Sequence, residues 1–197
     1  MTMSPLPRPS LPLACLLAAA LWPAACGAVT VGDNFTGASA QLNWLVFGGA
    51  CMTAGNGSGS IPACGSKDPS GNTQVGGYAG SLPDSNGNGA LRLTNSAGSQ
   101  SGAIVYNSLF PSNSGLQATF TSYTYAGDSG GSAGDGADGM SFFLLTAIPS
   151  AVGSFGGSLG YSCSNVNSPY NGIIGGYLGL GLDEYGNFPN GGYNNDN

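Results

Sequence analysis

The sequence of 197 residues contains no histidine, and Glu184 is its single glutamate. Mechanisms that depend on histidine, such as a Ser-His-Asp triad or a Cys-His pair, are therefore excluded within this chain. Glycoside hydrolysis usually needs two carboxylates that flank the bond. Asp135 and Asp138 could supply such a pair, but a glycine-rich segment supports acid–base chemistry only loosely. We therefore expect a protein that is not an enzyme.

Charged residues are scarce as well. Only three lysines and arginines face nine acids, and they stand far apart at Arg8, Lys67 and Arg92. Because no basic patch forms, we expect neither nucleic acid nor an anionic membrane surface as a partner. Charged residues make up 6% of the chain, which also holds 36 glycines. This composition is typical of an extracellular all-β protein, and an apolar fraction of 41% is too high for a disordered chain.

The first 28 residues have the organisation of a signal peptide. Arg8 is their only charge, an apolar run follows over residues 11–22, and small residues up to Ala28 end the segment. The run is shorter than the roughly 20 residues that a membrane span needs. We expect cleavage after Ala28, no membrane insertion afterwards, and a secreted or cell-surface protein, with the periplasm included. Cys26 leaves a lipoprotein anchor open as an alternative.

Residues 29–197 suit a single domain. Cys51 and Cys64 enclose a loop rich in glycine and serine, and an exported chain favours disulfides, so we predict that these two cysteines pair. Cys163 is then left over. It is either a buried thiol or the partner of a cysteine beyond Asn197.

Short apolar or alternating segments recur between glycine-rich turns, and this pattern predicts strands. The expected strands cover residues 42–47, 90–94, 103–106, 116–121 (with Tyr123 and Tyr125 continuing the alternation), 140–145 and 177–182. Residues 55–88 and 127–138 have the composition of loops. Many short strands separated by turns predict an antiparallel β-sandwich or a barrel. Because the last ten residues have turn composition, we expect a domain that lacks its last strands.

Three segments carry the polar residues best suited to binding a ligand. They are Ala137-Asp138-Gly139 before an apolar strand, Gly-Gly-Ser-Leu-Gly at 156–160, and the strand end and turn at 180–188. Sugars need fixed acceptors and donors beside an apolar face. Asp138 can accept from two hydroxyls, the Asn187 amide can donate, and Tyr185 or Phe188 can stack. A glycine N–H can approach a ligand closely because no Cβ intervenes.

Oxygen atoms in the last of these segments can meet at one point. Positions i and i+4 of an extended chain point the same way, so Asp183 and Asn187 can direct their oxygens together. A turned Tyr185 carbonyl can join them. Ligation by oxygen alone suits Ca²⁺, which takes about 6–8 oxygen ligands.

The same segments resemble the L-type (legume-type) lectin family. That family carries an A-D-G element before an F-F-L strand, then a G-G-x-L-G loop, then a strand that ends in D-x-[YF]-x-N. All three occur here in that order, so the resemblance is specific over residues 137–188. It is suggestive over 33–125, where Asp33-Asn34-Phe35 and Leu109-Phe110-Pro111 are similar to bacterial relatives. The resemblance implies a concanavalin A-like jelly roll that binds mannose, galactose or related sugars together with metal.

The resemblance also implies a role for individual residues. Asp138 would accept from sugar hydroxyls, Gly157 would donate its backbone amide, and Asn187 would bind both sugar and calcium. Asp183 and the Tyr185 carbonyl would bind calcium as well. The peptide between Ala137 and Asp138 would be cis.

The chain departs from the family at its transition-metal site. The family has a glutamate two residues before Asp183, where this chain has Gly181, and it also uses a histidine. We therefore expect no transition-metal site. The expected function is an exported, non-catalytic carbohydrate-binding module that uses calcium. Two alternatives stay open, namely a structural or adhesive sandwich without sugar binding and a glycan hydrolase or lyase of the same fold.

Overall fold

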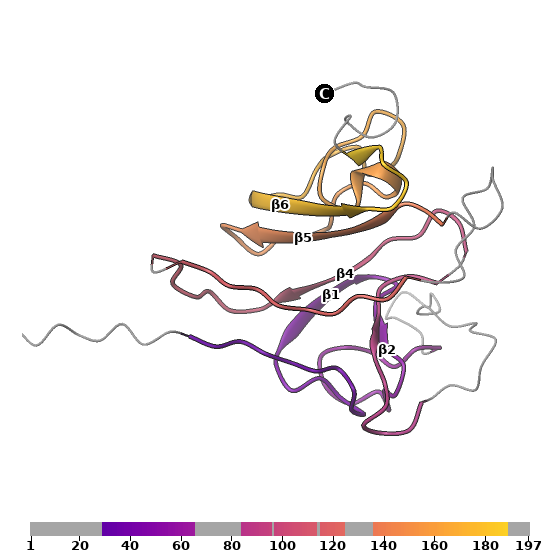
Figure 1. The fold of residues 1–197 in the computed structure, drawn as a ribbon, viewed down its shortest axis with the longest axis vertical. Coiled ribbons are helices and arrows are strands. Elements are labelled where there is room, and N and C mark those ends of the chain that lie inside the picture. Colours follow the sequence, from indigo (N-terminus) through magenta and orange to yellow (C-terminus); the bar gives the residue numbers. More distant parts are fainter. Residues whose placement is uncertain (1–28, 66–83, 96, 114, 125–135, 189–197) are drawn as a thin grey trace, which may run out of the picture.

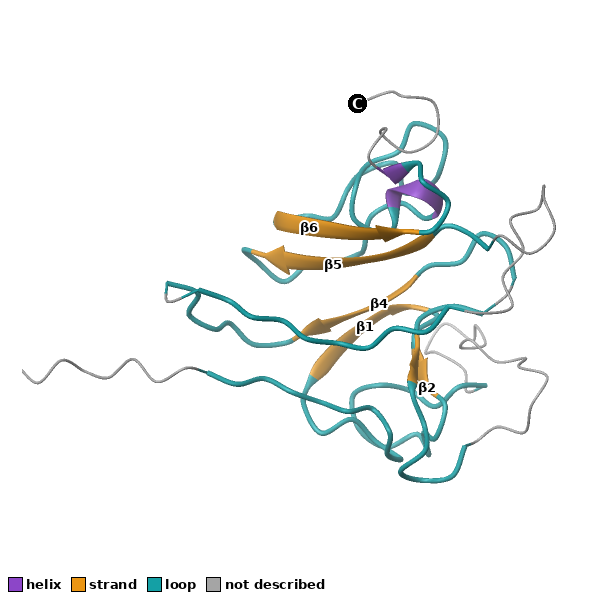
Figure 2. Cartoon of the chain, in the orientation of Figure 1, coloured by secondary structure: helices purple, strands orange, loops and turns teal. Residues whose placement is uncertain are grey.

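The computed structural model describes residues 29–65, 84–95, 97–113, 115–124 and 136–188. Its elements are β1 (Trp44–Gly48), β2 (Cys51–Met52), β3 (Leu91–Arg92), β4 (Gly102–Tyr106), β5 (Gly139–Leu145), the 3-10 helix η1 (Gly156–Ser158) and β6 (Gly176–Asp183). Loops make up much of the rest (Figure 2). No helix in these ranges has the length and apolar character that crossing a membrane requires. The expected signal peptide with Cys26, as well as Asp135, lies outside the described residues.

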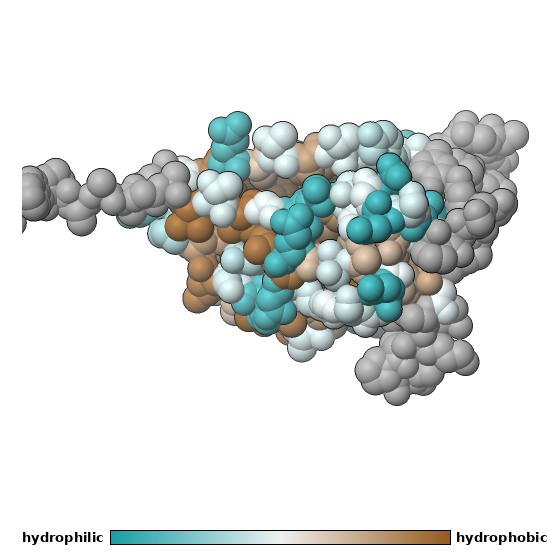
Figure 3. Space-filling model, turned by 90° about the horizontal axis from the view of Figure 1, so that it is seen from below, coloured by the Kyte–Doolittle hydropathy of each residue, from teal (hydrophilic) through white to brown (hydrophobic). Residues whose placement is uncertain are grey.

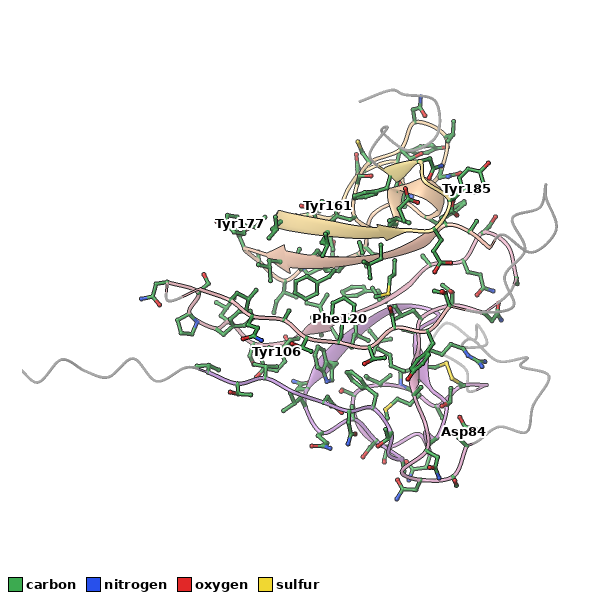
Figure 4. All side chains as sticks on the ribbon, in the orientation of Figure 1. Asp84, Tyr106, Phe120, Tyr161, Tyr177 and Tyr185 are labelled. Carbon is green, nitrogen blue, oxygen red and sulfur yellow. A yellow bond between two sulfur atoms is a disulfide. The ribbon has the colours of Figure 1, made fainter. Side chains whose placement is uncertain are left out.

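The strands form three two-stranded antiparallel sheets. β1 pairs with β4, β2 with β3, and β5 with β6. In Figure 1 the β5–β6 sheet lies above the β1–β4 sheet. The rings of Phe120 and Phe142 stack with their centroids 5.9 Å apart, and Figure 4 shows Phe120 between the two sheets. The described chain is therefore strand-rich, as expected of an all-β protein, and its sheets are small.

Every expected strand but one is confirmed, with bounds that differ by one or two residues. The prediction of a strand at 116–121 is wrong, because that segment lies outside the strand ladders of the described chain. Its alternation instead lets Phe120 pack on Phe142 of β5. β2 was not expected. It pairs with β3 through Cys51–Arg92 and Met52–Leu91. Met52 also forms a parallel bridge with Ala63, in which its N–H donates to the Pro62 carbonyl (2.9 Å) and its carbonyl accepts from Cys64 (3.1 Å).

The tightest packing in the described chain surrounds β2. The predicted disulfide between Cys51 and Cys64 is confirmed. The buried apolar residues beside it are Ala50, Met52, Ala54 and Ile61. Figure 3 shows the molecule from below, where brown apolar residues gather in the left half and polar residues are mixed among them. Cys163 is exposed, so the alternative that it is a buried thiol is wrong.

A carboxylate ties the start of the described chain to β1. Asp33 accepts hydrogen bonds from the backbone N–H groups of Phe35 (3.1 Å), Gln41 (2.7 Å) and Leu42 (3.2 Å) and from the indole N–H of Trp44 (3.2 Å). Burial raises the pKa of Asp33, but these bonds to its ionised form outweigh burial and hold the pKa below the ordinary value of 3.8. The ionised carboxylate therefore stabilises this part of the fold.

The two faces of the β5–β6 sheet differ in composition. One face carries the apolar pairs Met140–Leu182, Phe142–Leu180 and Leu144–Leu178. The other face includes Gly179 and Gly181. A Cβ at Gly179 would lie 2.5 Å from the Tyr161 ring, and a Cβ at Gly181 would lie 2.5 Å from the Phe188 ring. The loops that follow β5 and β6 can therefore lay aromatic rings directly on the backbone of β6.

Candidate functional site

The expected site begins where β5 starts and β6 ends. Gly139 pairs with Asp183 across the two strands. The carbonyl of Asp138 accepts hydrogen bonds from the N–H groups of Glu184 (3.0 Å) and Tyr185 (3.3 Å). Gly139 has a φ of +133°, and a Cβ at this position would collide with the backbone of β6. Glycine therefore allows the two strand ends to approach, which fixes Asp138 beside the turn after β6.

Asp138 is a partly buried carboxyl, and the peptide that precedes it is cis, as the resemblance implies. Burial raises the pKa of Asp138 above the ordinary value of 3.8, and the negative charge of Asp183 raises it further. The only basic residue in the described part of the chain is Arg92, which lies on β3 in a different sheet. A ligand that donates hydrogen bonds, or a cation, would therefore stabilise the ionised form of Asp138.

The glycine-rich segment at 156–160 forms the second part of the site. Gly156 has a φ of +77°, which favours glycine, and its carbonyl accepts the N–H of Leu159 at 2.8 Å to close a 3-10 turn. The Ser158 hydroxyl is buried and donates to the Cys163 carbonyl at 2.8 Å. These bonds hold Gly157, which is also buried, in a fixed position.

The Asn187 side chain lies directly on Gly157. A Cβ at Gly157 would lie 2.5 Å from both Nδ2 and Oδ1 of Asn187 and 2.6 Å from its Cγ. Only glycine leaves room for this amide. The Oδ1 atom of Asn187 is buried, and no other group in the described residues forms a hydrogen bond with it. A buried acceptor without a partner is costly, so this atom is suited to a ligand or a cation.

Asp138 lies near Gly156, the glycine that precedes Gly157. Its Oδ2 atom is 3.9 Å from the position that a Cβ on Gly156 would take. Three of the residues expected to bind sugar, Asp138, Gly157 and Asn187, therefore come together around Gly156 and Gly157. Tyr185 lies at the same end of β6, and 52% of its surface is exposed. Figure 4 shows Tyr177 at the other end of the strand. The Tyr185 ring is accessible for stacking.

The expected calcium ligands stand on the turn after β6. The carboxylate of Asp183 accepts from the N–H groups of Gly186 (2.9 Å) and Phe188 (2.7 Å), which closes the turn. Asp183, the unpartnered Oδ1 of Asn187 and the Tyr185 carbonyl are oxygen donors of the kind that Ca²⁺ prefers. The described residues contain no group of three or more His, Cys, Asp or Glu that could hold a metal. Calcium would therefore rely on water and backbone oxygens for most of its ligands.

Gly181 has a packing role. The Phe188 ring occupies the space that a side chain at position 181 would fill, because a Cβ there would meet Cδ1 of Phe188 at 2.5 Å. The aromatic ring therefore covers the backbone of β6 at this position.

One residue of the site was missed by reasoning from the sequence. Asn167 lies in the loop between η1 and β6, and its Nδ2 atom is 2.7 Å from the Cβ position of Gly156. The local sequence Ser-Asn-Val-Asn-Ser-Pro indicates only a loop. No spacing or periodicity in it could have placed Asn167 beside Asp138.

No family model, curated protein or solved structure matches this chain. A function for this chain is therefore inferred from its residues and from their geometry.

Proposed function

We propose that this chain is an exported carbohydrate-binding module built on an antiparallel β-sandwich of the concanavalin A-like type. One observation carries the proposal. Asp138, Gly157 and Asn187 come from three separate segments, and they meet around one pair of glycines. The disulfide between Cys51 and Cys64 fits an exported protein, because disulfides persist in oxidising compartments.

The chemistry of the site suits a neutral sugar. The Asp138 carboxylate accepts from hydroxyl groups, the Asn187 amide and the Gly157 N–H donate to them, and the exposed Tyr185 ring offers a face for stacking. Four contacts of about 1 kcal/mol each correspond to a dissociation constant of about 1 mM. The assay must therefore detect weak binding, which a multivalent glycan surface does.

A glycan array probed with the full chain in the presence of calcium tests the proposal. We expect Asp138→Asn to weaken the signal at least about tenfold, because loss of the carboxylate removes a charged acceptor. Asp84→Asn is the matched control, since it makes the same charge change at an exposed residue far from Tyr185 (Figure 4). A blank array for the unmodified chain would reject sugar binding and favour the adhesive alternative. New reducing ends on the glycans would favour a hydrolase.

The proposal includes a calcium ion held by Asp183, Asn187 and the Tyr185 carbonyl. When bound, it would fix the turn that carries Asn187. We expect removal of calcium by a chelator to lower both the melting temperature and the glycan signal, and we expect added calcium to restore them. Unchanged values after exhaustive chelation would mean that the site works without metal.

A further inference from the structure

Asn167 is held in place by a turn that closes on itself. Its N–H donates to the Ser164 hydroxyl at 3.0 Å, and its carbonyl accepts the N–H of Tyr170 at 3.0 Å. Ser164 in turn donates its N–H to the Tyr170 carbonyl at 2.8 Å. Asn167 is partly buried, whereas Val166 and Ser168 on either side of it are exposed. The turn therefore directs Asn167 inward and its neighbours outward.

The Asn167 side chain reaches the same glycine as Asp138. Its Nδ2 atom lies 2.7 Å from the Cβ position of Gly156, and Oδ2 of Asp138 lies 3.9 Å from that position. Nδ2 also donates to the Phe155 carbonyl at 3.3 Å. A side-chain donor and a side-chain acceptor thus flank Gly156, just as Asn187 flanks Gly157.

The Asn167 amide keeps hydrogen-bonding capacity after its contact with Phe155. An asparagine amide has two N–H donors and one carbonyl acceptor. At 3.3 Å the bond to Phe155 is longer than the common length of about 2.9–3.0 Å, so it is a weak one. This bond uses one of the two N–H groups of the amide. One N–H therefore remains for a ligand that lies against Asp138.

We infer that Asn167 is a further ligand-contacting residue, which donates to a hydroxyl next to the one that Asp138 accepts from. This inference rests on the proposed carbohydrate function. A carboxylate only accepts and an amide N–H only donates, so one of two neighbouring hydroxyls can donate to Asp138 while the other accepts from Asn167. The ligand class is then a neutral sugar with two adjacent free hydroxyls. Negatively charged sugars are disfavoured, because Asp138 and Asp183 repel them.

The experiment uses the full chain and calorimetric titration with the methyl glycosides of mannose, glucose, galactose and N-acetylglucosamine. Monodeoxy analogues of the tightest binder follow. We expect Asn167→Ala to weaken the parent glycoside about three- to tenfold, the worth of one neutral hydrogen bond. We also expect one deoxy analogue to bind the variant and the unmodified chain equally, because it lacks the hydroxyl that Asn167 contacts.

Two variants complete the design. Asn167→Leu keeps about the size and branching of the side chain, removes both donors and adds no charge near Asp138, so it should give the same pattern if Asn167→Ala does not fold. Asn165→Ala, an exposed asparagine of the same loop, is the control and should bind like the unmodified chain.

Each other outcome overturns a defined part of the reasoning. If Asn167→Ala weakens binding of the parent glycoside and of every deoxy analogue equally, Asn167 acts only through its hydrogen bond to the Phe155 carbonyl. If Asn167→Ala leaves binding unchanged, Asn167 has no role in binding. Either result, together with loss of binding in Asp138→Asn, overturns this inference alone. If the unmodified chain binds none of the four glycosides, the proposed function fails and this inference fails with it.

Discussion

Gly157→Ala is the sharpest perturbation of the site, because it adds one carbon atom where the Asn187 amide lies. The new Cβ would sit 2.5 Å from Nδ2 and Oδ1 of Asn187, whereas ordinary contact begins at 3.4 Å. Gly157 is buried within η1, so the backbone has little room to yield. The side chain of Asn187 must therefore move, by about 1 Å, and a hydrogen bond stretched by this much is lost.

The size of the effect follows from the bonds that Asn187 would make. If its amide contributes two hydrogen bonds of about 0.5–1.5 kcal/mol each, sugar binding weakens by about 1–3 kcal/mol, or about 5- to 150-fold. The free energy of unfolding should fall by about 1 kcal/mol, the lower end for overpacking, because the atoms that yield belong to a side chain.

Two assays check this prediction separately. Glycan binding by calorimetry measures the site, and urea unfolding measures the clash. Gly98→Ala is the control, because a Cβ there has nothing within 4 Å. The cost of Gly157→Ala in stability should vanish in an Asn187→Ala background, where the clashing amide is absent. The reasoning is refuted if Gly157→Ala costs the same in both backgrounds, and the proposed role of Asn187 is refuted if Gly157→Ala leaves binding intact.

Two further predictions concern stability. Because the folded-state pKa of Asp33 lies below 3.8, its ionised form stabilises the fold above about pH 4, and this stabilisation is lost as the pH falls through the folded-state pKa. Asp33→Asn should lower the free energy of unfolding at pH 7 by about 1 kcal/mol, a small value because the carboxyl is partly open to solvent, and the loss measured in urea titrations should be smaller at pH 3 than at pH 7. Equal losses at both pH values would contradict this. Gly181→Ala should cost about 1–3 kcal/mol in thermal unfolding through its clash with Phe188. Phe188→Ala should relieve that cost, and a cost that persists would show that Phe188 is not its cause.

Much of the strand pattern could be predicted from the sequence, because β5 and β6 are apolar runs between glycine-rich turns. The error at 116–121 has a physical reason. Alternation does not show that a backbone pairs: residues 115–124 are exposed and form no ladder, and their contact with β5 includes the stacking of Phe120 on Phe142. β2 could not be predicted, because two residues have no period. It depends on pairing with β3, which lies far away in the sequence.

Some residues of the candidate site could also be predicted from the sequence, and others could not. Asp138, Gly157 and Asn187 could be chosen from the sequence because each stands in a motif next to a strand or turn. Asn167 could not, because it reaches Gly156 through a turn that tertiary contacts orient. Gly181 was interpreted as a missing metal ligand, and its neighbour in space, Phe188, could only be found in the folded chain.

The two glycines of β6 that lie under aromatic rings set a condition on how this chain can change during evolution. Gly179 can accept a larger residue only if Tyr161 becomes smaller, and Gly181 only if Phe188 does. Substitutions at these positions should therefore be inherited as pairs, and each pair should vary without regard to the other. Leu180, which lies between them in sequence, points to the opposite face and belongs to neither pair. Substitutions at Gly179, Leu180 and Gly181 would then occur independently of one another, although the three residues are consecutive in the sequence.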